Sequence, residues 1–211
     1  MFIVIDGPDG SGKTTLAKHL VQQLCLENHQ AIYTSEPTCD CEAGRSIRQM
    51  LQSDGITDVY AFADLFVADR KEHLINLILP HLEAGGWVVC DRYKYSALAY
   101  QQMQGVDVQY LIKSNETCLI PDYIFILLPS NTDILINRIV RRGDVAEMFE
   151  KEELLDMALY YYHNLSSYFP NENIWYLNAD LPIEDNLCRI KSIISEKNLL
   201  PGQIESLCCQ N

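Results

Sequence analysis

A glycine-rich segment near the start of the sequence carries its clearest chemical signal. Residues 7–14 read Gly-Pro-Asp-Gly-Ser-Gly-Lys-Thr and fit the pattern G-x-x-x-x-G-K-[ST] in full. The glycines let backbone N–H groups turn inward around phosphate oxygens, and the following helix adds a partial positive charge. We expect Lys13 to reach the β- and γ-phosphates of a nucleotide and Thr14 to help hold Mg²⁺. The predicted phosphate-binding residues are Gly7, Asp9, Gly10, Ser11, Gly12, Lys13, Thr14 and Thr15.

A charge pair ends a short apolar run in the middle of the chain. Asp91 and Arg92 follow the run Trp87–Cys90, and ligands of α/β proteins bind where parallel strands end. We expect Asp91 to orient Mg²⁺, through water or through Thr14. Arg92 is expected to clamp an acceptor phosphate with its planar fork. The alternative is a structural ion pair at the sheet edge.

An aromatic residue and an arginine lie four residues apart, at Phe66 and Arg70, and would share one face of a helix. A ring and a guanidinium presented together suit a pyrimidine base. The ring stacks on the base, and the guanidinium donates to a carbonyl oxygen. Alternatively, Phe66 is a core residue and Arg70 a surface charge.

Three arginines lie within five residues just before Gly143, at Arg138, Arg141 and Arg142. Phosphoryl transfer needs positive charge on the transferring group, and a well-placed arginine is worth ~10³–10⁵ in rate. The cluster predicts such a group on a hinged segment, with Arg138 and Arg142 favoured. A solvated basic turn is the alternative.

Alternating strands and helices are predicted to position these residues. The short apolar runs without period-2 alternation are typical of strands covered on both faces. Two longer stretches, Thr14–Glu27 and Tyr60–Leu82, have apolar residues at helical spacing. Together they predict a parallel sheet with right-handed crossovers. The predicted strands are Phe2–Asp6, Ala31–Ser35, Trp87–Asp91, Tyr123–Leu128 and Ile174–Asn178.

Composition narrows the class of protein. The 211 residues suit one α/β domain, and the net charge of −13 argues against non-specific nucleic-acid binding. No apolar run approaches the roughly 20 residues of a membrane span, and we expect a cytoplasmic protein. Its eight cysteines are scattered, which favours reduced thiols. Cys39 and Cys41 lack the second pair or nearby histidine of a zinc site.

The glycine-rich loop is shared by GTPases, ATPases and small-molecule kinases. The chain has no Asn-Lys-x-Asp guanine motif and no long insertion typical of motor ATPases. Its length suits a core that closes over two small ligands. We therefore interpret the chain as a small-molecule kinase.

From Met1 to about Leu199 the sequence resembles the thymidylate kinase family. Four features carry the resemblance and occur in the family's order: the phosphate loop with acidic Asp9, Thr34–Pro37, Phe66–Arg70, and Asp91–Tyr93 continuing to Ser96, Tyr100 and Gln101. Singly the last three are weak patterns, but in this order they are specific. Gly10 stands where one subtype has an arginine, so the chain is similar to the lid-arginine subtype.

The resemblance implies ATP-dependent phosphorylation of dTMP to dTDP, with Mg²⁺, by a homodimer. It also implies a three-layer fold like other nucleoside monophosphate kinases, with a five-stranded parallel sheet in the order 2-3-1-4-5 and helices on both faces. Residues 1–199 would form one kinase domain with a lid at about 138–150, and residues 200–211 a loose tail.

Several acceptor-site roles come from the resemblance alone. Arg70 would bond the thymine O4, and Asp9 the 3′-hydroxyl of the sugar. Tyr100 would crowd the 2′ position and so favour deoxyribose. The other residues implied to bind the acceptor are Glu36, near Mg²⁺, with Pro37, Arg48 and Arg92 near its phosphate, Ser96, and Gln101 at the thymine edge.

Two positions depart from the family pattern. Ser35 stands where many relatives have arginine, and Ala97 replaces a small hydroxyl residue, so that fewer side chains contact the base. Another deoxynucleoside monophosphate such as dUMP is therefore an alternative acceptor. Two further alternatives are a deoxynucleoside kinase, against which the Arg92 clamp argues, and a weakly active nucleotide-binding partner protein.

Overall fold

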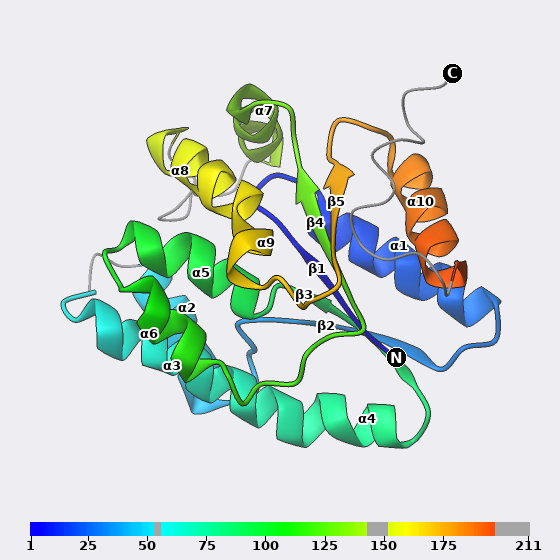
Figure 1. The fold of residues 1–211 in the computed structure, drawn as a ribbon, viewed down its shortest axis with the longest axis horizontal. Helices are drawn as coiled ribbons and strands as arrows, with labels where there is room; N and C mark the ends of the chain where they lie inside the picture. The colour runs from blue at the N-terminus through cyan, green and yellow to red at the C-terminus, as the bar shows by residue number, and fades with distance from the viewer. Residues whose placement is uncertain (53–55, 143–151, 197–211) are drawn as a thin grey trace.

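The computed structural model describes residues 1–52, 56–142 and 152–196. Its strands have the predicted bounds: β1 Phe2–Asp6, β2 Ala31–Ser35, β3 Trp87–Asp91, β4 Tyr123–Leu128 and β5 Ile174–Asn178. They form one parallel sheet in the order β2-β3-β1-β4-β5 (Figure 1), which confirms the predicted fold class. In register, Ile5 lies opposite Asp91, so β1 and β3 end together beside the glycine-rich loop.

Helices cover both faces of the sheet (Figure 1). Alternate residues of β1 face two cores. Ile3 and Ile5 pack on α1 and α10, whereas Phe2 and Val4 pack on the side of α3, α5 and α8. The helices are α1 Lys13–Leu26, α2 Glu42–Leu51, α3 Val59–His73, α4 Leu79–Glu83, α5 Lys94–Met103, α6 Val108–Ser114, α7 Thr132–Arg142, α8 Glu152–His163, α9 Leu165–Tyr168 and α10 Ile183–Ser195.

The stretch predicted as one helix over Tyr60–Leu82 contains a π-helical turn, η1 (Leu74–Ile78), between α3 and α4. Here the Leu79 N–H donates to the carbonyl of Leu74, five residues back. Pro80 in the first turn of α4 has no N–H to donate and its ring crowds the preceding turn, which explains why the α-helical pattern changes at this point.

Six of the eight cysteines fall within the described residues, and all six are free. Cys41 caps helix α2, because its sulfur accepts a hydrogen bond from the Gly44 N–H at 3.2 Å. Across residues 1–52, 56–142 and 152–196, no helix is both long enough and apolar enough to cross a bilayer.

Candidate active site

Asp6, the last residue of β1, organises the start of the glycine-rich loop. Its buried carboxylate accepts hydrogen bonds from the Gly7 N–H at 2.8 Å and from the Ser96 hydroxyl at 2.6 Å. The Tyr162 hydroxyl also donates to it at 2.8 Å, and the Tyr93 N–H at 3.1 Å. These contacts tie the loop to the start of α5 and to α8.

Gly10 lies against helix α7. Its φ is +78°, and a Cβ here would lie 2.8 Å from the Leu135 carbonyl oxygen and 3.1 Å from the Ile139 side chain. Such contacts are too short for any side chain unless α7 moves. The position that carries an arginine in the other subtype therefore has no room for one here.

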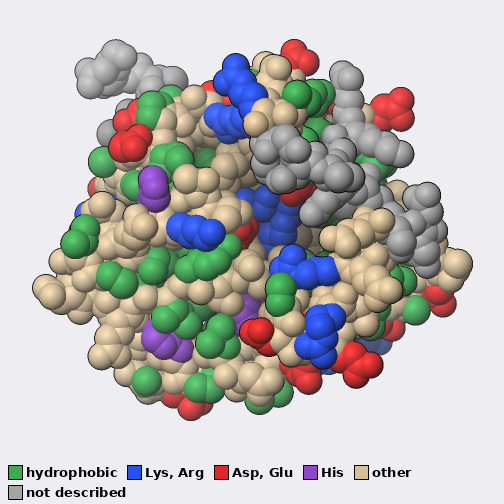
Figure 2. Space-filling model, turned by 180° about the vertical axis from the view of Figure 1, so that it is seen from behind, with side chains coloured by type: hydrophobic (Ala, Val, Ile, Leu, Met, Phe, Trp, Pro, Cys, Tyr) green, Lys and Arg blue, Asp and Glu red, His purple; other side chains and the backbone are tan. Residues whose placement is uncertain are grey.

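A cavity of about 690 Å³ opens between the glycine-rich loop, the ends of β2 and β3, and helices α3 and α5. Figure 2 shows lysine and arginine side chains in and around a hollow on one face of the molecule. Although the chain has a net charge of −13, five cations face only three carboxylates in this cavity. The charged lining residues are Lys13, Arg48, Arg70, Arg92 and Arg138, with Asp9, Glu36 and Asp91.

Asp9 holds two of these cations. Its Oδ1 forms an ion pair with Arg92 Nη2 and lies 3.4 Å from Lys13 Nζ, while its Oδ2 accepts from the Tyr100 hydroxyl at 3.1 Å. Burial raises the pKa of the Asp9 carboxyl, but Arg92 and Lys13 outweigh burial, so the pKa lies well below its ordinary value of 3.8. Asp9 is therefore a carboxylate at neutral pH.

We expect Asp9→Asn to lower the melting temperature at neutral pH, because Arg92 and Lys13 lose their shared counter-charge. A carboxyl with a lowered folded-state pKa stabilises the fold above its unfolded-state pKa, and this stabilisation is lost as the pH falls. The melting-temperature difference between wild type and variant should thus be full above about pH 5 and shrink below about pH 4. Circular dichroism melts across this range measure it, and a pH-independent difference would contradict the ionised cluster.

Arg92 adopts a left-handed backbone conformation, with φ at +71°, directly after β3. Its N–H donates to the Ile5 carbonyl at 3.0 Å, and its Nη1 lies 3.4 Å from both the Gly7 carbonyl oxygen and the Ser96 hydroxyl. Non-glycine residues rarely adopt this conformation, and it is typical of functional sites. The sharp turn directs the guanidinium back across the glycine-rich loop.

Thr14 and Asp91 meet at the base of the cavity, where the Thr14 hydroxyl donates to Asp91 Oδ2. Tyr33 also donates to this oxygen at 3.3 Å, and burial together with Asp91 raises the pKa of Tyr33 to about 12. Asp91 Oδ1 is buried and has no hydrogen-bond partner among the described residues. The Thr14 hydroxyl and the Asp91 carboxylate, with its unpaired Oδ1, are oxygen ligands that fit hydrated Mg²⁺.

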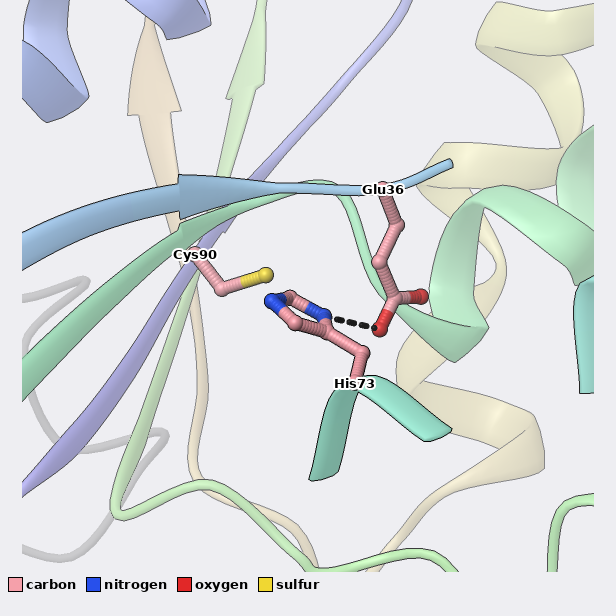
Figure 3. Close-up of side chains that lie close together, drawn as sticks. All are labelled: Glu36, His73 and Cys90. Atoms are coloured by element: carbon pink, nitrogen blue, oxygen red, sulfur yellow. Dashed lines mark hydrogen bonds and ion pairs between the residues drawn. The ribbon is translucent and has the colours of Figure 1, made fainter. Parts of the chain in front are cut away.

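Arg70 is 1% exposed yet lines the cavity. Its Nε donates to Glu36 Oε2 at 2.8 Å, its Nη1 donates to Asn115 Oδ1, and its Cζ lies 5.1 Å from the centre of the Tyr93 ring. None of these contacts uses Nη2. The other oxygen of Glu36 contacts His73, as Figure 3 shows.

Arg48 reaches the cavity from α2. Its Nε donates to the Thr38 carbonyl at 3.2 Å and its Nη2 to that of Pro37. Buried Asp69 of α3 holds the segment between β2 and α2, since it accepts from the Thr38 N–H at 3.0 Å and from the Cys41 thiol at 3.0 Å.

Gln101 and Phe66 line the same cavity. Gln101 is 1% exposed, and its Oε1 has no hydrogen-bond partner within the described part of the chain. Phe66 packs edge-on against Phe62, with ring centres 5.2 Å apart, and so links the cavity wall to the core. An unpaired buried acceptor beside a cavity is expected where a ligand supplies the missing N–H.

A second cavity of about 290 Å³ lies on the other side of the glycine-rich loop, between the start of α1 and the segment from Ala179 to Asn186. Arg138 of α7 lines both cavities. Its guanidinium donates to the Ser11 carbonyl at 3.1 Å and to the Ala179 carbonyl at 2.9 Å.

The main cavity brings together most residues predicted from the sequence. Two predicted residues of the glycine-rich loop do not line the main cavity: Gly7 lines neither cavity, and Ser11 lines the second one. The side chain of Arg142 and the lid beyond it lie outside the described residues, as do Cys208 and Cys209. Lining residues that were predicted are Asp9, Gly10, Gly12, Lys13, Thr14, Thr15, Glu36, Pro37, Arg48, Phe66, Arg70, Asp91, Arg92, Ser96, Tyr100, Gln101 and Arg138.

Sequence reasoning missed the residues that hold this site in place: Asp6, Tyr33, His73, Asn115 and Tyr162. Only Asp6 had a usable signal, because a charge at the end of an apolar strand beside a phosphate loop requires a partner.

Comparison with known proteins gives one family. The model described as thymidylate kinase matches residues 5–190. A probable thymidylate kinase of Pyrococcus horikoshii is 38% identical over 203 residues, covering 94% of this chain and 97% of the relative. One from Thermococcus kodakarensis is 36% identical, covering 93% of this chain and all of the relative. The thymidylate kinase of Brachyspira hyodysenteriae is 31% identical, with 94% and 95% covered.

Proposed function

Because the chain belongs to the thymidylate kinase family, we propose that it transfers the γ-phosphoryl group of ATP to dTMP, giving dTDP and ADP. The protein's part is positioning and electrostatic stabilisation, with no covalent intermediate. One observation carries the proposal. A single cavity presents a guanidinium (Arg70), an unpaired acceptor (Gln101) and a second guanidinium (Arg92).

The base edge of thymine complements the first two groups. O4 accepts a hydrogen bond and suits Arg70, while the neighbouring N3–H donates one and suits Gln101 Oε1. Cytosine carries an amino group and an unprotonated N3 at the same places, which reverses both polarities. Phe66 supplies a flat apolar surface for the base.

The rest of the acceptor fits beside the glycine-rich loop. Arg92 and Arg48 are proposed to donate to its phosphate, since both residues line the cavity. The Tyr100 hydroxyl contacts Asp9 twice, because it donates to Oδ2 and also accepts from the Asp9 N–H at 3.2 Å. A rigid ring here would crowd a 2′-hydroxyl and leave Asp9 to bond the 3′-hydroxyl.

The donor nucleotide approaches from the opposite side. With its phosphates in the loop and the acceptor in the main cavity, the second cavity offers room for its base on the other side of the loop. Arg138 lies between the two cavities, next to the path of the phosphates. Mg²⁺ bound near Thr14 and Asp91 would neutralise phosphate charge, and Lys13 would bond the β- and γ-phosphates.

We also retain three expectations from the sequence as proposals: one kinase domain over residues 1–199, a homodimer, and a cytoplasmic location. Arg142 is proposed as a second lid arginine, because Gly10 leaves no room for one in the loop.

A coupled ADP-release assay tests the function directly. We expect dTMP to be the best acceptor in a panel with dUMP, dCMP, dGMP, UMP and thymidine, with MgATP as the donor. Thymidine should be inert, because it lacks the phosphate that Arg92 binds. Faster turnover of thymidine than of dTMP would contradict the proposed contact of Arg92 with the acceptor phosphate. Binding of ATP without turnover of any acceptor would favour a nucleotide-binding partner protein.

A further inference from the structure

Two residues one turn apart on α3 hold the two oxygens of Glu36. Arg70 Nε donates to Oε2 at 2.8 Å, and His73 Nδ1 lies 3.1 Å from Oε1, as drawn in Figure 3. All three side chains are at most 3% exposed. On its far side, His73 Nε2 lies 2.6 Å from the Thr34 hydroxyl.

The chemistry of the groups fixes the direction of the bond between His73 and Glu36. A carboxylate can only accept, so Nδ1 of His73 carries the hydrogen that points to Glu36. On its other side, Nε2 is paired with the Thr34 hydroxyl, which can either donate or accept. The chain of contacts thus runs from β2 through His73 and Glu36 to the guanidinium of Arg70.

We propose that His73 is a positioning residue for the acceptor base: it fixes Glu36, which orients Arg70 toward the pyrimidine. This inference rests on the proposed function. Glu36 held at one oxygen only would rotate about its side-chain bonds, and Arg70 would follow, because their contact is the hydrogen bond at Nε. Asn115 anchors only Nη1. His73 therefore acts on base recognition and not on the phosphate groups, for which Lys13 and Arg92 are proposed.

A cation site is the competing interpretation of the same cluster, since donor atoms of Glu36, His73 and Cys90 lie within 4.8 Å of one another. Each of these possible ligand atoms already has a hydrogen-bond partner. Both Glu36 oxygens and both His73 nitrogens have the partners given above, and the Cys90 thiol donates to the Arg92 carbonyl at 3.1 Å. Burial raises the pKa of this thiol well above its ordinary value, so it is a neutral S–H and a poor ligand.

Two amide variants distinguish the contribution of His73 Nδ1 from that of Nε2. The amide N–H of His73→Asn reaches the position of Nδ1, whereas that of His73→Gln reaches the position of Nε2. We expect His73→Gln to raise KM for dTMP about tenfold with kcat changed less than about threefold, and to lower the dTMP-over-dCMP preference about tenfold. His73→Asn should restore both values to within about threefold of wild type.

Thr34→Val is the matched second variant, because it removes only the hydroxyl at Nε2 with little change in volume. Its preference for dTMP should fall by about threefold, which keeps the test decisive if His73→Gln does not fold. Melting temperatures of all variants control for stability.

The inference is overturned if the Asn and Gln variants have equal kinetics, or if stability falls while the dTMP-over-dCMP ratio stays at its wild-type value. In both cases the wild-type enzyme would still phosphorylate dTMP. A wild-type enzyme that does not phosphorylate dTMP would instead overturn the proposed function, and this inference with it.

Discussion

Lys13→Met is expected to lower kcat for dTMP phosphorylation about a thousandfold, with a smaller change in KM. The Lys13 side chain is only 8% exposed and lies 3.3 Å from the Pro8 carbonyl and 3.4 Å from Asp9. Its ammonium group is therefore held inside the loop, where we propose that the β- and γ-phosphates bind. Methionine keeps the length of the side chain and removes the charge, so the fold persists while charge developing in the transition state is unopposed.

Single-turnover measurements with saturating MgATP and dTMP isolate the chemical step from product release. Lys113→Met is the control, since Lys113 is exposed on α6 and lines neither cavity. A Lys13→Met enzyme within about tenfold of the wild-type rate would mean that another group supplies this charge. Arg138 would then be the first candidate, because it lines both cavities.

The sheet was predictable because each strand is short, apolar and followed by a polar turn. Phe2–Asp6 lacks alternation since both its faces are buried, and the same pattern located the other four strands. Lys13 and Thr14 were predictable from another local signal, because they are part of the glycine-rich motif itself. The π-helical turn was not, because an apolar pattern at helical spacing does not distinguish a wide turn from an α-helical one.

The support of the site depends on contacts between distant segments. Glu36 meets Arg70 and His73 across 34 and 37 residues, and no local pattern pairs a histidine with that carboxylate. The conformation of Arg92 is likewise a tertiary effect, since an arginine has no intrinsic preference for φ near +71°. Residue types thus indicated which groups line the cavity, and the fold alone reveals what orients those groups.

The orientation of Arg92 leads to the second large effect. Arg92→Lys is expected to lower kcat/KM for dTMP about a hundredfold, because the two-pronged phosphate contact is lost. Arg92→Met is expected to lower it about a thousandfold, because the charge is lost as well. Lysine retains the charge beside Asp9. It cannot reproduce the separate contacts of Nη1 with the Gly7 carbonyl and of Nη2 with Asp9.

Steady-state kinetics at varied dTMP and saturating MgATP measure the effect, and Arg45→Met is the control. Arg45 is an exposed arginine of α2 that bonds the Asp40 carbonyl at 2.9 Å and lines neither cavity. If Arg92→Lys kept nearly the wild-type kcat/KM, charge alone would suffice and the fork would be dispensable. A loss confined to the methionine variant would mean that Arg92 binds the acceptor phosphate through its charge. A loss in both variants would mean that it binds through directed hydrogen bonds.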